Sequence, residues 1–238
     1  MNAIETNRLT KCFGAVTAVD GLDLTVHAGE LFALLGVNGA GKTTTIKMLS
    51  GLLRPTDGTA RVLGYDLKTE LPAIKQCIAV SPQETAVAPN LTVRENLELI
   101  AGIYGIDRSR VQTVLNELGL KKTETCRAKK LSGGWQRRLS IAMALVSEPK
   151  LLFLDEPTLG LDVLARRELW HVIEGLKGRV TVILTTHYLE EAEALADRVG
   201  VMNGGSLKIC GTPQELLKAA GTERFEDAFI RLAGGEAQ

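Results

Sequence analysis

A glycine-rich segment follows a short apolar run near the start of this chain, and it limits the possible folds more than any other feature. Residues 31–35 read LFALL, and residues 36–43 read GVNGAGKT. The apolar run is typical of a strand buried on both faces of a sheet. The second segment fits G-x-x-x-x-G-K-[ST], a loop that joins such a strand to a helix and surrounds a phosphate with backbone N–H groups. Together they predict an α/β domain with a phosphate-binding loop.

The residues of this loop have candidate roles in binding a nucleotide. Glycines let the backbone approach an anion, and the positive end of the following helix adds attraction. Lys42 would reach the β- and γ-phosphates, and the hydroxyl of Thr43 would bind Mg²⁺. The predicted nucleotide-binding residues of this segment are Gly36, Val37, Asn38, Gly39, Ala40, Gly41, Lys42, Thr43 and Thr44.

Further short apolar runs predict the rest of the sheet. They cover residues 78–80, 151–154 and 180–184, and helical stretches lie between them. This alternation predicts a mostly parallel sheet whose strands are joined by right-handed crossovers. Near the start, Leu22, Leu24 and Val26 alternate with polar residues, which predicts a half-buried strand.

The middle of the chain has no strand pattern and predicts a helical insert. Thr92 and Glu95 form a capping box before a helical apolar pattern, and a second such pattern ends at Gly119. We therefore expect one domain over the whole chain. Its α/β core would cover residues 1–90 and 131–238, and its helical subdomain would cover residues 91–130.

Polar side chains end three of the predicted strands. Asp155 and Glu156 follow residues 151–154, at the edge of the sheet where ligands of α/β proteins bind. Asp155 is placed to hold Mg²⁺, and Glu156 could deprotonate an attacking water. Gln83 and His187 follow two other runs, where they could sense a γ-phosphate, and Gln83 could also touch Mg²⁺. The predicted catalytic residues are Glu156, His187 and Gln83, and the predicted metal ligands are Thr43, Gln83 and Asp155.

Residues 131–134 read LSGG and precede a helix expected over residues 135–146. Ser132 would cap this helix through its side chain. Gly133 and Gly134 would leave backbone N–H groups free to face a phosphate. A second acidic turn follows at residues 160–162, which read GLD.

The order of these motifs resembles that of the ATP-binding cassette (ABC) ATPases, the nucleotide-binding subunits of ABC transporters. The resemblance covers nearly the whole chain. It implies a P-loop NTPase core with an N-terminal antiparallel β subdomain and the inserted helical subdomain. It also implies that two subunits, here a homodimer, enclose two ATP molecules, each between the phosphate loop of one subunit and the LSGG helix of the other.

The resemblance implies roles for residues outside the phosphate loop. Phe13 matches the aromatic residue that stacks on adenine, although an ordinary core aromatic is the alternative. Asp162 would lie at the dimer interface. Trp135 departs from the family, which often has Gln or a smaller residue at that position. The implied nucleotide-binding residues of this group are Phe13, Ser132, Gly133, Gly134, Gln136 and Asp162.

The C-terminal third resembles the bacterial drug-efflux and polysaccharide-export branch. In that branch the helical insert binds a separate membrane permease. We therefore expect an ATPase on the inner face of the cell membrane that powers export. A non-transport ABC protein acting in translation or DNA maintenance is the alternative, and a kinase or GTPase is a further one. The zero net charge gives no broad electrostatic case for nucleic acid, and the scattered cysteines predict reduced thiols in the cytosol.

Overall fold

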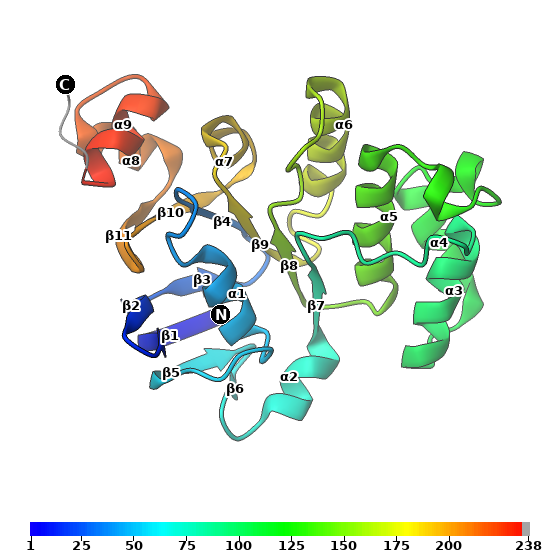
Figure 1. Cartoon of the computed structure of the whole chain (residues 1–238), viewed down its shortest axis with the longest axis horizontal. Helices are drawn as coiled ribbons and strands as arrows, with labels where there is room; N and C mark the ends of the chain where they lie inside the picture. The colour runs from blue at the N-terminus through cyan, green and yellow to red at the C-terminus, as the bar shows by residue number, and fades with distance from the viewer. Residues whose placement is uncertain (235–238) are drawn as a thin grey trace.

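A computed structural model describes residues 1–234 as two sheets with helices around them (Figure 1). The last four residues, which the expected core range 131–238 includes, lie outside the described residues. No helix in the described part of the chain is both long and apolar enough to cross a bilayer.

The larger sheet has the order β11-β10-β4-β9-β8-β7. Its strands are β4 (Leu31–Leu35), β7 (Ile78–Ser81), β8 (Leu151–Asp155), β9 (Thr181–Thr186), β10 (Arg198–Asn203) and β11 (Ser206–Gly211). All pairs are parallel except β10 with β11. The mostly parallel sheet is confirmed, and the β10–β11 hairpin adds two strands that the apolar runs did not predict.

The smaller sheet is antiparallel and has the order β2-β1-β5-β6, with β3 paired to β1. Its strands are β1 (Asn2–Phe13), β2 (Val16–Leu22), β3 (Thr25–His27), β5 (Asp57–Val62) and β6 (Tyr65–Asp66). The single strand expected from Leu22, Leu24 and Val26 is wrong, because the chain leaves β2 at Leu22 and enters β3 at Thr25. The hydroxyl of Thr6 bridges this break, since it donates to the carbonyl oxygen of Leu22 at 2.7 Å and accepts from Leu24 N at 2.8 Å.

Alternating residues of the parallel strands serve two hydrophobic cores. Phe32 and Leu34 face one core, which also contains α1 (Lys42–Leu49) and the inner face of the antiparallel sheet. Leu31, Ala33 and Leu35 face the other core, which is covered by the helices that follow residue 92. Because both faces are covered, the parallel strands are continuously apolar, as their sequence indicates.

The helices connect the strands and form the insert. They are α1 (Lys42–Leu49), α2 (Leu71–Cys77), α3 (Val93–Tyr104), α4 (Arg108–Glu117), α5 (Gly133–Val146), α6 (Val163–Glu174), α7 (Leu189–Leu195), α8 (Pro213–Ala220) and α9 (Phe225–Leu232). Thr92 and Glu95 form the expected capping box at α3. The 3-10 turns η1 (Lys121–Thr123) and η2 (Ala128–Lys130) follow α4. The division into a core and a helical subdomain stays a prediction.

Candidate functional site

Two glycines of the phosphate loop occupy positions where a side chain would collide with the main chain. A Cβ on Gly36 would lie 2.5 Å from the carbonyl oxygen of Met202, and one on Gly41 would lie 2.5 Å from that of Ala18. Gly41 also has a φ of 100°, in the left-handed region that glycine adopts without strain. These glycines let the loop pass close to β10 and β2 before α1 begins at Lys42.

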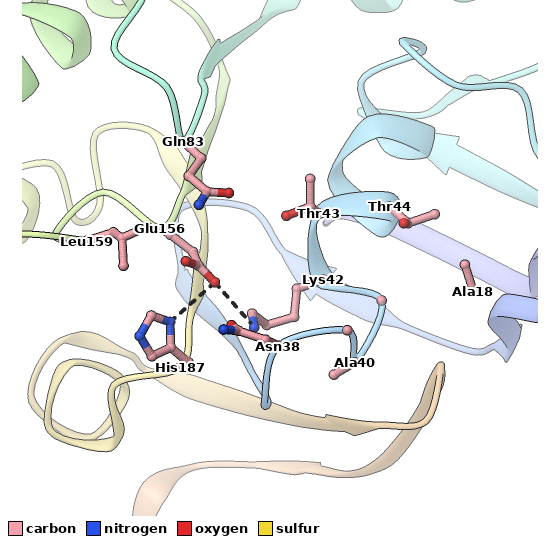
Figure 2. Close-up of a pocket in the computed structure, with 12 residues that line it drawn as sticks. Ala18, Asn38, Ala40, Lys42, Thr43, Thr44, Gln83, Glu156, Leu159 and His187 are labelled. Atoms are coloured by element: carbon pink, nitrogen blue, oxygen red, sulfur yellow. Dashed lines mark ion pairs between the residues drawn. The ribbon is translucent and has the colours of Figure 1, made fainter.

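The loop forms one wall of a cavity of about 490 Å³ (Figure 2). Strands β4, β9 and β8 lie side by side, and Lys42, His187 and Glu156 follow their carboxyl ends. The order of the sheet therefore brings together residues that are far apart in the sequence. The predicted residues that line the cavity are Asn38, Gly39, Ala40, Gly41, Lys42, Thr43, Thr44, Gln83, Glu156 and His187.

Lys42 is buried, and its ammonium group is bound by its own loop and by Glu156. Nζ donates hydrogen bonds to the carbonyl oxygens of Gly36 at 2.7 Å and Val37 at 3.2 Å. It also lies 3.4 Å from Oε1 of Glu156 in an ion pair (Figure 2). The ammonium can exchange Glu156 for a phosphate oxygen without leaving the cavity.

Asp155, at the end of β8, lies beside two hydroxyl groups. Its Oδ1 accepts hydrogen bonds from Thr43 Oγ1 at 3.0 Å and from Thr185 Oγ1 at 2.6 Å. Mg²⁺ prefers oxygen ligands and is usually held by one or two carboxylates together with substrate phosphates. The donor set of Asp155 and Thr43 therefore fits Mg²⁺. Sequence reasoning missed Thr185, whose only signal was its place near the end of a predicted strand.

Glu156 has an unusual backbone conformation. Its φ is 46°, and its N–H group donates at 3.1 Å to both the carbonyl and the hydroxyl oxygen of Thr185. Residues other than glycine rarely adopt such a backbone, and those that do are common at functional sites. Nδ1 of His187 lies 3.3 Å from Oε1 of Glu156. The expected base and the expected γ-phosphate sensor are therefore neighbours.

Gln83 and Phe13 lie at the margins of this region. Gln83 is exposed in the loop after β7, and its side chain points into the cavity across from Thr43 (Figure 2). Phe13, at the end of β1, is 50% exposed, and Lys11 Nζ lies 5.1 Å from the centre of its ring. A ring so exposed is not a core aromatic, so that alternative is excluded. The ring is available to stack on a planar base.

The LSGG turn lies outside the phosphate-loop cavity. Helix α5 begins at Gly133, and Ser132 is its N-cap residue. The side chain of Ser132 makes no capping hydrogen bond within the described chain. Our prediction that the side chain of Ser132 caps this helix is therefore wrong. The predicted start of the helix, at residue 135, is also wrong. The helix starts earlier because both glycines adopt helical conformation, and the exposed Ser132 hydroxyl stays available to a ligand.

A second cavity of about 230 Å³ lies beside the LSGG turn. Among its lining residues are Ser132, Gly134, Trp135 and Asp162. The guanidinium of Arg138 covers the ring of Trp135, at 4.6 Å from the centroid. The side chain of Gln136 does not line this cavity. Its amide donates instead to the carbonyl oxygens of Ala128 and Leu131, both at 3.2 Å. Gln136 thus holds the preceding loop, and its role in nucleotide binding stays a prediction.

Glu191 is a buried carboxyl on α7, and we expect it to make stability depend on pH. Burial raises its pKa above the usual value near 4.5, and the 3.0 Å hydrogen bond from Trp170 Nε1 offsets this only in part. The neutral carboxyl stabilises the fold fully below pH 4.5, and this contribution is lost as the pH rises through the raised pKa. Glu191→Gln should therefore gain stability over wild type as the pH increases. Thermal unfolding from pH 4.5 to 8 measures this gap, and a constant gap would contradict the prediction.

The chain matches the family described as ABC transporter over residues 19–159, more than half of its length. The chain belongs to the ABC transporter family. It is 44% identical to the daunorubicin/doxorubicin resistance ATP-binding protein DrrA of Streptomyces peucetius, over 96% of this chain and 72% of that protein. It is 42% identical to the probable multidrug ABC transporter ATP-binding protein YbhF of Escherichia coli (strain K12), over 96% of this chain and 41% of that protein.

Solved structures of ABC cassettes share the fold. The ATP-binding subunit of an ABC transporter superposes with a TM-score of 0.85 at 29% identity, over 97% of this chain and 99% of that one. A cassette in a dimeric, post-hydrolysis state bound to ADP and Pi gives a TM-score of 0.77 at 25% identity, over 88% of this chain and 98% of that one. The P-loop NTPase fold is confirmed. The chain is an ATP-binding subunit with ATPase activity, and a non-transport role is not favoured.

Proposed function

We propose that this ABC ATPase forms a homodimer around two ATP molecules and powers export through a separate membrane permease. The main observation in favour of a dimer is that the phosphate loop and the LSGG turn line two different cavities. The phosphate-loop cavity and the LSGG cavity share no lining residue. The two motifs therefore line different cavities of one subunit, and a second copy can supply an LSGG turn to the phosphate-loop cavity.

Exposed apolar side chains near the two cavities support the proposal that a partner subunit covers this surface. Val163 and Leu164, which follow Asp162 at the start of α6, are 65% and 76% exposed. Val37 in the phosphate loop is 53% exposed. Apolar residues that gather around functional motifs are typical of surfaces that a partner covers. In the proposed dimer the partner subunit would cover them when the two ATP sites close.

In this proposal each charged residue of the cavity has one task. Lys42 exchanges Glu156 for the phosphates of ATP, which leaves Glu156 free to take a proton from the attacking water. His187, which contacts Glu156, would hydrogen-bond the γ-phosphate. Thr43 and Asp155 would hold Mg²⁺, which neutralises charge on the transferred phosphoryl group when it is bound. Phe13 would support the adenine ring from its exposed position.

The permease surface would lie on the helical insert, outside the ATP site. Leu99, Ile103 and Tyr104 are exposed apolar residues of α3, at 47%, 68% and 51%. The loop from Gln83 leads into α3, so a partner bound there would be linked to the ATP cavity. The relatives named as drug-resistance and multidrug transporter ATP-binding proteins support an export role. In that role the subunit would lie on the inner face of the cell membrane.

Co-purification from detergent-solubilised membranes tests the export proposal. We expect the tagged subunit to retain an integral membrane permease, and Ile103→Ser to lose most of it. Ile230→Ser is the matched control, because Ile230 is a 41% exposed apolar residue on the distant helix α9. Recovery of ribosomes or DNA in place of a membrane protein would overturn the export proposal.

A further inference from the structure

Two buried ionisable side chains, Arg137 and Glu191, have no task in the ATP site described above, and Arg137 is the cation of the two. Within residues 1–234, the buried charged side chains are Lys42, Arg137, Asp155, Glu156 and Glu191. Arg137 lies on α5, on the helix that begins with the LSGG turn, and is 6% exposed. About four residues separate it from Gly133, so it lies roughly 6 Å further along the helix axis.

The guanidinium of Arg137 binds main-chain carbonyl groups of the Gln83 loop. Its Nη1 donates to the carbonyl oxygen of Pro82 at 2.8 Å, and its Nη2 donates to that of Gln83. One turn further along α5, the hydroxyl of Ser140 forms a 3.0 Å hydrogen bond with that of Ser81. One face of the LSGG helix is therefore bonded to residues 81–83, and Gln83 itself lines the phosphate-loop cavity.

The far end of the same loop is also held by a buried side chain. Asn96 of α3 is fully buried, and its Oδ1 accepts from Ala88 N at 2.8 Å. Its Nδ2 donates to the carbonyl oxygen of Thr92 at 2.9 Å. The loop that carries Gln83 thus has one anchor on α5 and one on α3, so movement of its first residues is tied to the LSGG helix.

Burial of the Arg137 guanidinium is unfavourable, and its hydrogen bonds to the Gln83 loop compensate for the lost hydration. Burial lowers the pKa of Arg137, and the Asp155 carboxylate offsets part of that effect. The guanidinium still carries its charge at neutral pH. A buried charge without a close ionic partner destabilises the fold unless hydrogen bonds compensate it. Two charge-assisted hydrogen bonds in a fixed fork are what an apolar residue cannot supply.

We propose that Arg137 is a positioning residue that couples the two ATP sites of the dimer. It fixes the main chain of Gln83, which faces the ATP of its own subunit, to the helix whose LSGG turn faces the ATP of the other subunit. A displacement of Gln83 at one site thereby moves the LSGG helix at the other. This coupling rests on the proposed function of Gln83 and of the head-to-tail dimer.

The test measures ATP hydrolysis and ATP binding by the full-length chain. Arg137→Met should lower kcat about 10- to 100-fold, the range expected when a catalytic group is displaced by about 1 Å. ATP affinity should change less than about twofold, and the Hill coefficient for ATP should fall toward one. Arg137→Lys keeps a charged donor and should recover part of the rate. Arg110→Met is the matched control, because Arg110 donates at 3.2 Å to the carbonyl oxygen of Leu145 at the other end of α5.

A double-mutant cycle with Gln83→Ala separates coupling from a general packing defect. If Arg137 acts through Gln83, Arg137→Met should cause little further loss of kcat in the Gln83→Ala background. Additive losses, or a wild-type Hill coefficient in Arg137→Met and Arg137→Lys, would overturn the coupling and leave the proposed function in place. A wild-type kcat in Gln83→Ala alone would overturn the role of Gln83 and the coupling with it.

Discussion

The Glu156→Gln variant is expected to bind ATP but to hydrolyse it about 10²–10⁴ times more slowly than the wild type. That range is typical for loss of a general base. The amide has nearly the size of the carboxyl group, but it cannot accept a proton at neutral pH. Lys42 loses its ionic partner in the free protein and can still turn to the phosphates. Phosphate release under saturating ATP measures the rate, and a fluorescent nucleotide measures affinity.

Glu148→Gln is the matched control for this variant. Glu148 is the other glutamate with a positive φ, 53°, and it is exposed in a surface pair with Arg110. It should keep the wild-type rate, because it lies outside the phosphate-loop cavity. A wild-type rate in Glu156→Gln would show that another group activates the water.

The Glu156→Gln variant should also accumulate as a closed dimer in the presence of ATP, and tryptophan emission can report this closure. Trp135 lines the LSGG cavity, where the nucleotide of the other subunit would enter. Trp170 is the second of the two tryptophans and bonds to Glu191, four residues after His187 in the chain, so it could respond as well. A Trp170→Phe background isolates Trp135. ATP should then change the emission of Glu156→Gln, and Trp135→Phe should abolish the change.

Features that depend on neighbouring residues could be predicted from the sequence. The strand at residues 31–35, the glycine loop and the helix after it are set by apolar continuity and by the steric needs of Gly36 and Gly41. The capping box of Thr92 and Glu95 is equally local. The β10–β11 hairpin was missed because Gly200 interrupts its apolar run. Glycine is needed at this position, because a Cβ on residue 200 would lie 2.9 Å from the ring of Phe32.

Features that depend on the order of the sheet could not be predicted from the sequence. The carboxyl end of β9 lies between those of β4 and β8, and it brings Thr185 to Asp155 and His187 to Glu156. The individual residues Glu156 and His187 were recognised as candidates, but their contact has no signature in the sequence. The bond from Arg137 to the Gln83 loop was missed for the same reason, because packing of α5 against β7 creates it.

The Lys42→Ala variant is expected to lose ATP binding, and with it nearly all hydrolysis. It should also be less stable, because the buried Glu156 would keep His187 as its one remaining ion-pair partner within residues 1–234. Breaking a buried ion pair by removing one partner costs about 3–5 kcal/mol, and the lower end applies here because the cavity admits water. For a chain of this size about 3 kcal/mol corresponds to a fall in Tm of roughly 6–12 °C.

The double variant Lys42→Ala/Glu156→Gln separates these two effects of Lys42. Removing the charge of Glu156 removes the unpaired carboxylate, so the double variant should regain much of the lost Tm. ATP binding should stay lost, because the glutamine supplies no cation for the phosphates. Thermal unfolding and titration with fluorescent nucleotide measure the two properties independently. If the double variant recovered nucleotide affinity together with stability, Lys42 would act through Glu156 and the fold of the loop, and its proposed contact with the phosphates would be wrong.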